Sequence, residues 1–184
     1  MASNNETHHE ELDYLRDGRT IWSWMSTIDH KRIGIMYLWT TFVFFAVAGF
    51  LALALRLEHW TPTQTIMGPD TYNKVFTLHG AIMVFMFIIP SVPSALGNFF
   101  LPLMLGAKDV AFPRLNLATY YLFLVGAGMA IYAIVTGEGV DTGWTFYTPY
   151  SIKTSSGVIM TVMGVFIMGF ASIFTGLNFI ATIH

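Results

Sequence analysis

The sequence of 184 residues contains no cysteine. This absence excludes a disulfide framework, a thiolate zinc site, a cysteine-ligated iron–sulfur cluster and a heme attached through a C-x-x-C-H motif. Charged residues are also scarce, at 11% of the chain, whereas soluble domains carry about 25%. The net charge of −2 offers no basic surface of the kind that nucleic-acid binding requires, so we expect no nucleic-acid partner. High hydrophobicity excludes a disordered chain and leaves a membrane protein as the class to test.

Four stretches lack Asp, Glu, Lys and Arg altogether, at 33–55, 75–105, 115–135 and 157–183. Each is long enough to cross a membrane, since about 20 apolar residues in a helix span the hydrocarbon of a bilayer. None alternates polar and apolar residues with a period of two, so membrane strands are not expected. A very apolar soluble helical bundle is the alternative, but charge-free runs of this length rarely recur four times in a soluble chain. The sequence predicts an all-α integral membrane protein with four transmembrane helices over these ranges.

Lys and Arg are distributed unevenly between the two ends of the predicted helices. One side carries six of them and the other carries three, and the positive-inside rule therefore places the N-terminus in the cytoplasm. The six are Arg16, Arg19, Lys31, Arg32, Lys108 and Arg114; the three are Arg56, Lys74 and Lys153. We divide the chain into a cytoplasmic N-terminal arm with an interfacial anchor (1–32) and a membrane domain (33–184). Trp22 and Trp24, just before the first span, are the expected anchor.

Polar residues inside the predicted spans are the candidates for function. His79 lies four residues into the second span, and an ionisable group in hydrocarbon indicates a functional site. Its imidazole suits a metal or a heme iron, although a hydrogen bond to a neighbouring helix would also explain it. Pro90 and Pro93 predict a bend in the same span.

A second group of polar residues falls at the cytoplasmic face. Asp109 follows the second span, and Asn98, Asn116 and Asn178 lie near the same face. A carboxylate of ordinary pKa collects protons there, and amides can order the water that carries them inward. The alternative is a solvated loop carboxylate with asparagines that cap or join helices. At the outer face, a snorkelling Arg56 beside Glu58, and aromatic-belt residues around Trp144, need no function to explain them.

Several of these residues occur in motifs that resemble subunit I of the heme–copper terminal oxidases. The resemblance covers about residues 25 to 184, and the motifs follow the family order along the predicted helices. They are Asp29–Tyr37, Arg56–Glu58, Thr77–Gly80, Gly97–Asn98, Pro102–Leu103, Gly106–Asn116, Gly143–Thr145 and Leu177–Thr182. Family chains have twelve helices, so the resemblance makes this chain the first third of that bundle.

The resemblance implies a role for each candidate. His79 matches the ligand of the low-spin heme iron, and Arg56 matches the arginine that bonds the formyl group where that heme is heme A. Trp144 and Tyr147 match residues on the propionate side of the hemes, and Glu58 matches a carboxylate that helps hold calcium or sodium in some members. Asp109 matches the mouth of the D proton pathway. The polar lining of that pathway is matched by Asn98, Asn116, Asn178, Ser172 and Tyr37. Ala171 stands where a second serine often occurs.

Much of the family's catalytic machinery lies beyond residue 184. The high-spin heme and copper belong to the missing helices, so we expect a chain that cannot reduce oxygen alone. We expect a truncated form of a longer subunit, with one piece of a split subunit as the alternative. The implied partners are the rest of subunit I, subunits II and III, and cytochrome c, in a bacterial inner membrane; a mitochondrial inner membrane fits the same pattern.

Two alternatives remain open. In quinol oxidases, an Arg, an Asp, a His and a Gln surround the quinol; the corresponding positions here are Val47, Leu51, Thr71 and Lys74, and none matches. A four-helix membrane scaffold or carrier without heme is the alternative from another class.

Overall fold

The computed structural model describes residues 20–63, 66–135 and 139–184, and every regular element in these ranges is a helix. The elements are α1 (Ile21–Met25), α2 (His30–Glu58), α3 (Pro69–Ala81), η1 (Ile82–Ile88), η2 (Ser91–Gly97), α4 (Asn98–Leu105), α5 (Pro113–Val135), α6 (Tyr150–Lys153) and α7 (Val158–Ile183). The segments from α3 to α4 follow one another as a single helical rod over Pro69–Leu105. Residues 1–19 of the predicted arm lie outside the described residues.

Four of these helical segments are long and apolar enough to cross a membrane, as the sequence predicts. They carry large apolar side chains on their outer surface, such as Trp39 (65% exposed) and Phe50 (73% exposed). Exposed apolar area of this kind is stable in lipid or against further membrane helices, not in water. The chain is therefore a multi-pass membrane protein.

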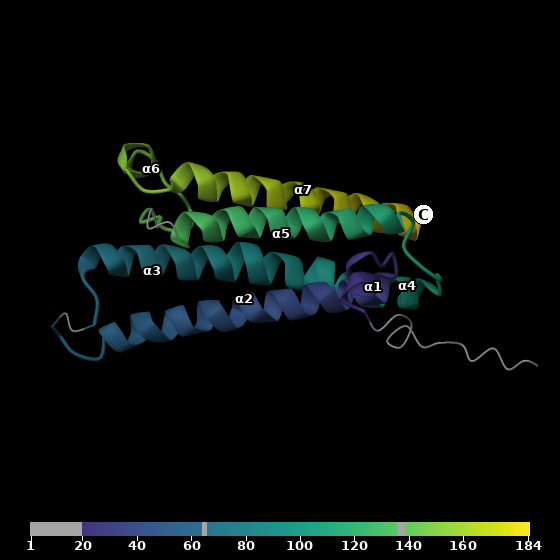
Figure 1. Cartoon of the computed structure of the whole chain (residues 1–184), viewed down its shortest axis with the longest axis horizontal. Coiled ribbons are helices and arrows are strands. Elements are labelled where there is room, and N and C mark those ends of the chain that lie inside the picture. Colours follow the sequence, from purple (N-terminus) through teal and green to yellow (C-terminus); the bar gives the residue numbers. More distant parts are fainter. Residues whose placement is uncertain (1–19, 64–65, 136–138) are drawn as a thin grey trace, which may run out of the picture.

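The four long segments lie side by side in the order α2, α3–α4, α5 and α7 (Figure 1). One end of the bundle contains α1, the end of α4 and the C-terminal end of α7 (Figure 1). We call it the α4 end. At the opposite end, the α6 end, lie α6 and the connection between α2 and α3 (Figure 1). Residues that the sequence separates widely, such as Asp29 and Asp109, therefore come to the same end.

Helix α2 begins at His30, so Lys31 and Arg32 lie in its first turn. The Asp29 carboxylate caps this helix and accepts hydrogen bonds from the N–H groups of Lys31 (2.7 Å) and Arg32 (3.2 Å). The Arg32 guanidinium is buried, donates to Ser23 Oγ and lies 5.1 Å from the centre of the Trp24 ring. Trp24 is thereby engaged with a cation, whereas Trp22 is 75% exposed and free to meet a membrane interface.

The proline-containing part of the second span is wound as π-helix. η1 precedes Pro90 and η2 contains Pro93, and together they join α3 to α4. Proline cannot donate the usual helical hydrogen bond, and its ring clashes with the carbonyl four residues earlier. A wider π turn moves that carbonyl away, and such turns occur frequently at functional sites. The helix therefore passes its prolines without ending.

Helices α5 and α7 form the most extensive helix–helix contact in the described chain, and two glycines lie within it. A Cβ added at Gly126 would lie 2.5 Å from the carbonyl oxygen of Gly164, and one added at Gly164 would lie 2.5 Å from that of Gly126. Small residues at crossing points let membrane helices approach closely, and packing supplies much of their attraction there. The α5–α7 pair depends on these two positions.

Replacing Gly126 or Gly164 by alanine is expected to lower the stability of the membrane domain by about 1–3 kcal/mol, because the two backbones must move apart. The matched control is Gly128→Ala on the same helix, since nothing lies within 4 Å of a Cβ there. Thermal unfolding of the purified protein measures the effect. Equal unfolding temperatures for the Gly126 and Gly128 variants would contradict the assignment.

Candidate functional site

His79 lies on α3, half-buried, and faces helix α2. Its Nδ1 is 2.9 Å from the backbone carbonyl oxygen of Ala48. A carbonyl oxygen can only accept, so Nδ1 carries the hydrogen and the neutral ring has its lone pair on Nε2. A backbone carbonyl that holds one ring nitrogen is the usual support of a metal-binding histidine. The contact therefore leaves Nε2 of His79 available to a ligand.

The other candidates at the α6 end lie at different distances from His79. Arg56 is exposed in the last turn of α2, eight residues or roughly 12 Å along the helix from Ala48. The Trp144 ring packs directly against Gly80, the neighbour of His79. Tyr147 is 77% exposed on the surface of the loop. The structure thus brings Trp144 to the helix of His79 and leaves Tyr147 outside that contact.

Glu58 is the last residue of α2 and bonds the backbone of the connection between α2 and α3. Its Oε2 accepts hydrogen bonds from the N–H groups of Ile66 (2.8 Å) and Met67 (3.0 Å). Calcium takes six to eight oxygen ligands, and the described ranges contain no group of three or more His, Asp or Glu residues able to hold a metal. The calcium or sodium role of Glu58 stays a prediction.

Asp109 lies at the α4 end, in the connection between α4 and α5. Its Oδ1 accepts from the N–H of Val110 at 2.7 Å. Burial raises the pKa of Asp109 above its usual value; the Val110 hydrogen bond and the nearby His30 act in the opposite direction and only partly offset it. A carboxyl group with a raised pKa holds its proton at higher pH, which suits a group that takes up protons.

The three asparagines near Asp109 are all fully buried, but they differ in bonding. Asn178 uses both ends of its amide on the backbone of Phe112, accepting from its N–H at 2.8 Å and donating to its carbonyl at 3.3 Å. Asn98 donates to the carbonyl of Ser94, and its Oδ1 has no partner. Asn116 has no partner for either side-chain atom. Buried polar atoms are normally paired, with protein or with ordered water, so Asn98 and Asn116 are the two water-binding candidates.

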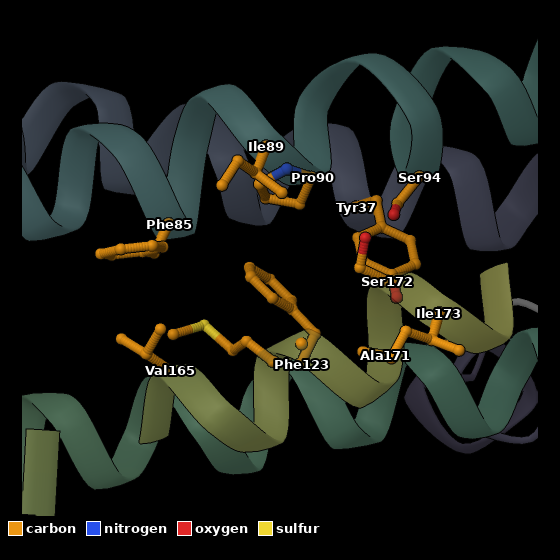
Figure 2. Close-up of a pocket in the computed structure, with 12 residues that line it drawn as sticks. Tyr37, Phe85, Ile89, Pro90, Ser94, Phe123, Val165, Ala171, Ser172 and Ile173 are labelled. Carbon is orange, nitrogen blue, oxygen red and sulfur yellow. The ribbon is translucent and has the colours of Figure 1, made fainter. Parts of the chain in front are cut away.

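Tyr37 and Ser172 lie deeper in the bundle and face a shared cavity of about 360 Å³. Figure 2 shows the hydroxyl-bearing side chains of Tyr37, Ser94 and Ser172 gathered at one end of this cavity, with Phe85 and Val165 at the other. The cavity lies between the π-helical segment and α7. One end is thus polar and the other apolar.

Two residues of this region were not singled out from the sequence. His30 is buried, and its Nδ1 lies 2.7 Å from the carbonyl oxygen of Asn98; its charged sequence neighbours gave no sign of burial. Thr119 accepts from the Tyr37 hydroxyl at 3.2 Å and donates to the carbonyl of Asn116 at 2.7 Å. Thr119 follows Asn116 by three residues, and this spacing on a helix places both on one face. That signal was available in the sequence.

Comparison with known proteins identifies the family. A family model described as "Cytochrome C and Quinol oxidase polypeptide I" matches residues 32–184. The chain belongs to this family. Its similarity to probable cytochrome c oxidase subunit 1-alpha of Streptomyces avermitilis is 40% identity over 188 residues, covering 99% of this chain and 32% of that protein. Cytochrome c oxidase subunit 1 of Thermostichus vulcanus is 37% identical over 167 residues, covering 88% of this chain and 30% of the relative.

An archaeal relative extends the range of the family. Cytochrome c oxidase polypeptide 1 of Halobacterium salinarum is 39% identical over 166 residues, which is 87% of this chain and 27% of the relative. The chain spans about a third of the length of the curated relatives it matches. The resemblance to the N-terminal part of a heme–copper oxidase subunit I is thereby confirmed, and such subunits imply hemes, copper and a multisubunit respiratory complex.

Proposed function

We propose that this chain is the N-terminal part of the catalytic subunit of a proton-pumping cytochrome c oxidase. In this proposal it supplies a ligand of the low-spin heme and the entrance of the D proton pathway. The observation that supports the proposal most directly is the hydrogen bond between His79 Nδ1 and the Ala48 carbonyl, because it leaves Nε2 free to bind iron.

The residues at the α6 end would hold the low-spin heme, for which we propose heme A. Nε2 of His79 would bind the iron, and the Ala48 carbonyl fixes the orientation of the ring. Arg56 would interact with the formyl group, and Trp144 and Tyr147 would contact the propionates. When bound, the heme supplies one-electron transfer toward the oxygen-reducing centre of high-spin heme and copper, whose ligands we assign to the missing helices.

The residues at the α4 end would take up protons. Asp109 exchanges a proton with the aqueous phase, because it lies in a connecting loop and is only half-buried. The unpaired amide atoms of Asn98 and Asn116 hold the water that receives this proton. From Asn116 the hydrogen bonds continue through Thr119 to Tyr37, which lines the same cavity as Ser172. Asn178 holds the loop behind Asp109 in place through Phe112.

The partners follow from the family. We propose assembly with the rest of subunit I and with subunits II and III, with cytochrome c as the electron donor. The N-terminus lies in the cytoplasm in this proposal, since the α4 end carries Asp109 and four of the seven Lys and Arg residues in the described ranges. The membrane is a bacterial inner membrane, by analogy with the bacterial relatives.

The test is a purified complex that contains this chain, examined by reduced-minus-oxidised spectroscopy and oxygen consumption. We expect the bands of a low-spin heme and oxygen uptake with reduced cytochrome c. Oxygen uptake with a quinol alone would place the chain in the quinol branch. A pigment-free complex would support the membrane scaffold and overturn the proposal.

A further inference from the structure

The loop between α5 and α7 is fastened to helix α3 beside His79. Thr77 is fully buried, and its Oγ1 accepts a hydrogen bond from the N–H of Gly143 at 2.8 Å. The same hydroxyl donates to the carbonyl of Asn73 at 2.8 Å, so it acts both as a donor and as an acceptor. Gly143 has a φ of +79°, which glycine adopts at little cost. The loop thus reaches the helix through a backbone amide that bonds the Thr77 hydroxyl.

A second contact lies on the other side of His79. A Cβ added at Gly80 would be 2.7 Å from Cδ1 of Trp144 and 3.0 Å from Cγ of the same ring. The indole therefore occupies the space that a side chain at position 80 would need. It also makes an edge contact with Phe85, at 6.2 Å between ring centres. Thr77 and Gly80 together bind the loop two residues before and one residue after His79.

Asp141 joins several parts of the loop through hydrogen bonds. Its carboxylate accepts hydrogen bonds from the hydroxyls of Tyr150 (2.7 Å), Thr154 (3.0 Å) and Ser156 (2.8 Å). Partial burial acts to raise the pKa of Asp141, but these three donors outweigh it, and the pKa is lowered below its usual value. The carboxylate is therefore ionised at neutral pH, and its charge-assisted hydrogen bonds connect both sides of the loop.

We propose that this loop clamps the helical turn that carries His79, and that Thr77 and Asp141 are positioning residues for the heme ligand. The Ala48 carbonyl fixes the rotation of the imidazole ring, whereas the clamp fixes the place of the whole turn. The inference rests on the proposed function of His79. It goes beyond that function because it assigns an orienting role to residues that contact neither iron nor substrate.

The central experiment replaces Thr77 by valine in the intact complex. Valine keeps the shape of threonine but leaves the Gly143 N–H without its acceptor. We expect the low-spin heme to remain bound, with shifted and broadened g-values in its electron paramagnetic resonance spectrum and an altered midpoint potential. Thr77→Ser keeps the hydroxyl and is expected to restore both. Thr71→Val on the same helix, at an exposed position, is the control and is expected to leave both unchanged.

Two further variants keep the proposal testable if the valine variant does not assemble. Gly80→Ala displaces the Trp144 ring and keeps the Thr77 hydroxyl, and Asp141→Asn weakens the loop from outside the membrane helices. Both are expected to shift the same spectrum in the same way. Heme spectra and potentials equal to those of the parent in all assembled variants would overturn the clamp. Retention of the low-spin signal after loss of His79 would instead overturn the proposed function.

Discussion

Replacing His79 by alanine in the intact oxidase is expected to abolish the low-spin heme signal and lower turnover more than about 100-fold. Loss of a group that merely supports a metal ligand costs 10- to 100-fold in affinity or activity, and loss of the ligand itself should exceed this. Of the other histidines in the described ranges, His30 and His184 lie at the α4 end of the bundle, and the exposed His59 at the α6 end bonds the Tyr72 hydroxyl through Nε2. Optical and paramagnetic resonance spectra of the purified complex measure the effect.

The matched control is His59→Gln. His59 lies at the end of α2, is exposed, and bonds the Tyr72 hydroxyl through Nε2 at 2.8 Å. Its replacement removes an imidazole from the same end of the bundle without touching the Ala48 contact, so the heme spectrum should be unchanged. An unaltered reduced spectrum in the alanine variant of His79 would refute the ligand role.

Replacing Asp109 by asparagine is expected to leave the heme spectrum intact, slow turnover by about tenfold or more, and stop proton pumping. Asparagine keeps an oxygen that can accept the Val110 N–H, so the loop should retain its shape. It has no proton to release, so the entrance is closed. Oxygen consumption and proton release by vesicles containing the complex measure the two effects. Undiminished pumping would eliminate Asp109 as the entrance.

The raised pKa of Asp109 gives a second measurement that separates this role from a structural one. The pKa of Asp109 is higher in the folded than in the unfolded state. The free energy of unfolding therefore falls as the pH rises from the unfolded-state pKa to the folded-state pKa. Above this window the folded protein carries the full cost of a half-buried charge. The asparagine variant avoids that cost, so its thermal stability at neutral pH should equal or exceed that of the parent. A clear loss of stability would indicate that Asp109 acts as a structural residue.

The absence of charge was sufficient to predict the four membrane helices, because a long helix in hydrocarbon tolerates few ionised groups. It was a poor guide to where the helices begin. α2 contains Lys31 and Arg32, and α3 contains Asp70 and Lys74, since helix ends can carry charges at the membrane surface. The Asp29 cap could have been recognised as a helix start, as aspartate is favoured at that position.

The candidate site was predicted less evenly. The sequence treated Asn98, Asn116 and Asn178 alike, whereas their bonding distinguishes two amides with unpaired atoms from one that fastens a loop. Which partners an amide finds depends on tertiary contacts, and spacing along the chain does not contain them. The π-helical winding around Pro90 likewise depends on the neighbours that satisfy its carbonyls. Thr119 was within reach, through its spacing from Asn116.

The contacts between α2 and α5 have a consequence for how the protein is assembled. Tyr37 meets Thr119 there, and Thr40 meets the Tyr120 hydroxyl at 2.9 Å. The α5–α7 pair packs through its own glycines, and α2 with the α3–α4 rod forms the other helical hairpin. The hydroxyl-lined route belongs to neither hairpin alone. The route forms when the two hairpins pack together. A shift of one hairpin by one residue along its helix axis, about 1.5 Å, would break it. If this route carries protons as proposed, proton conduction depends on the register in which the two hairpins meet.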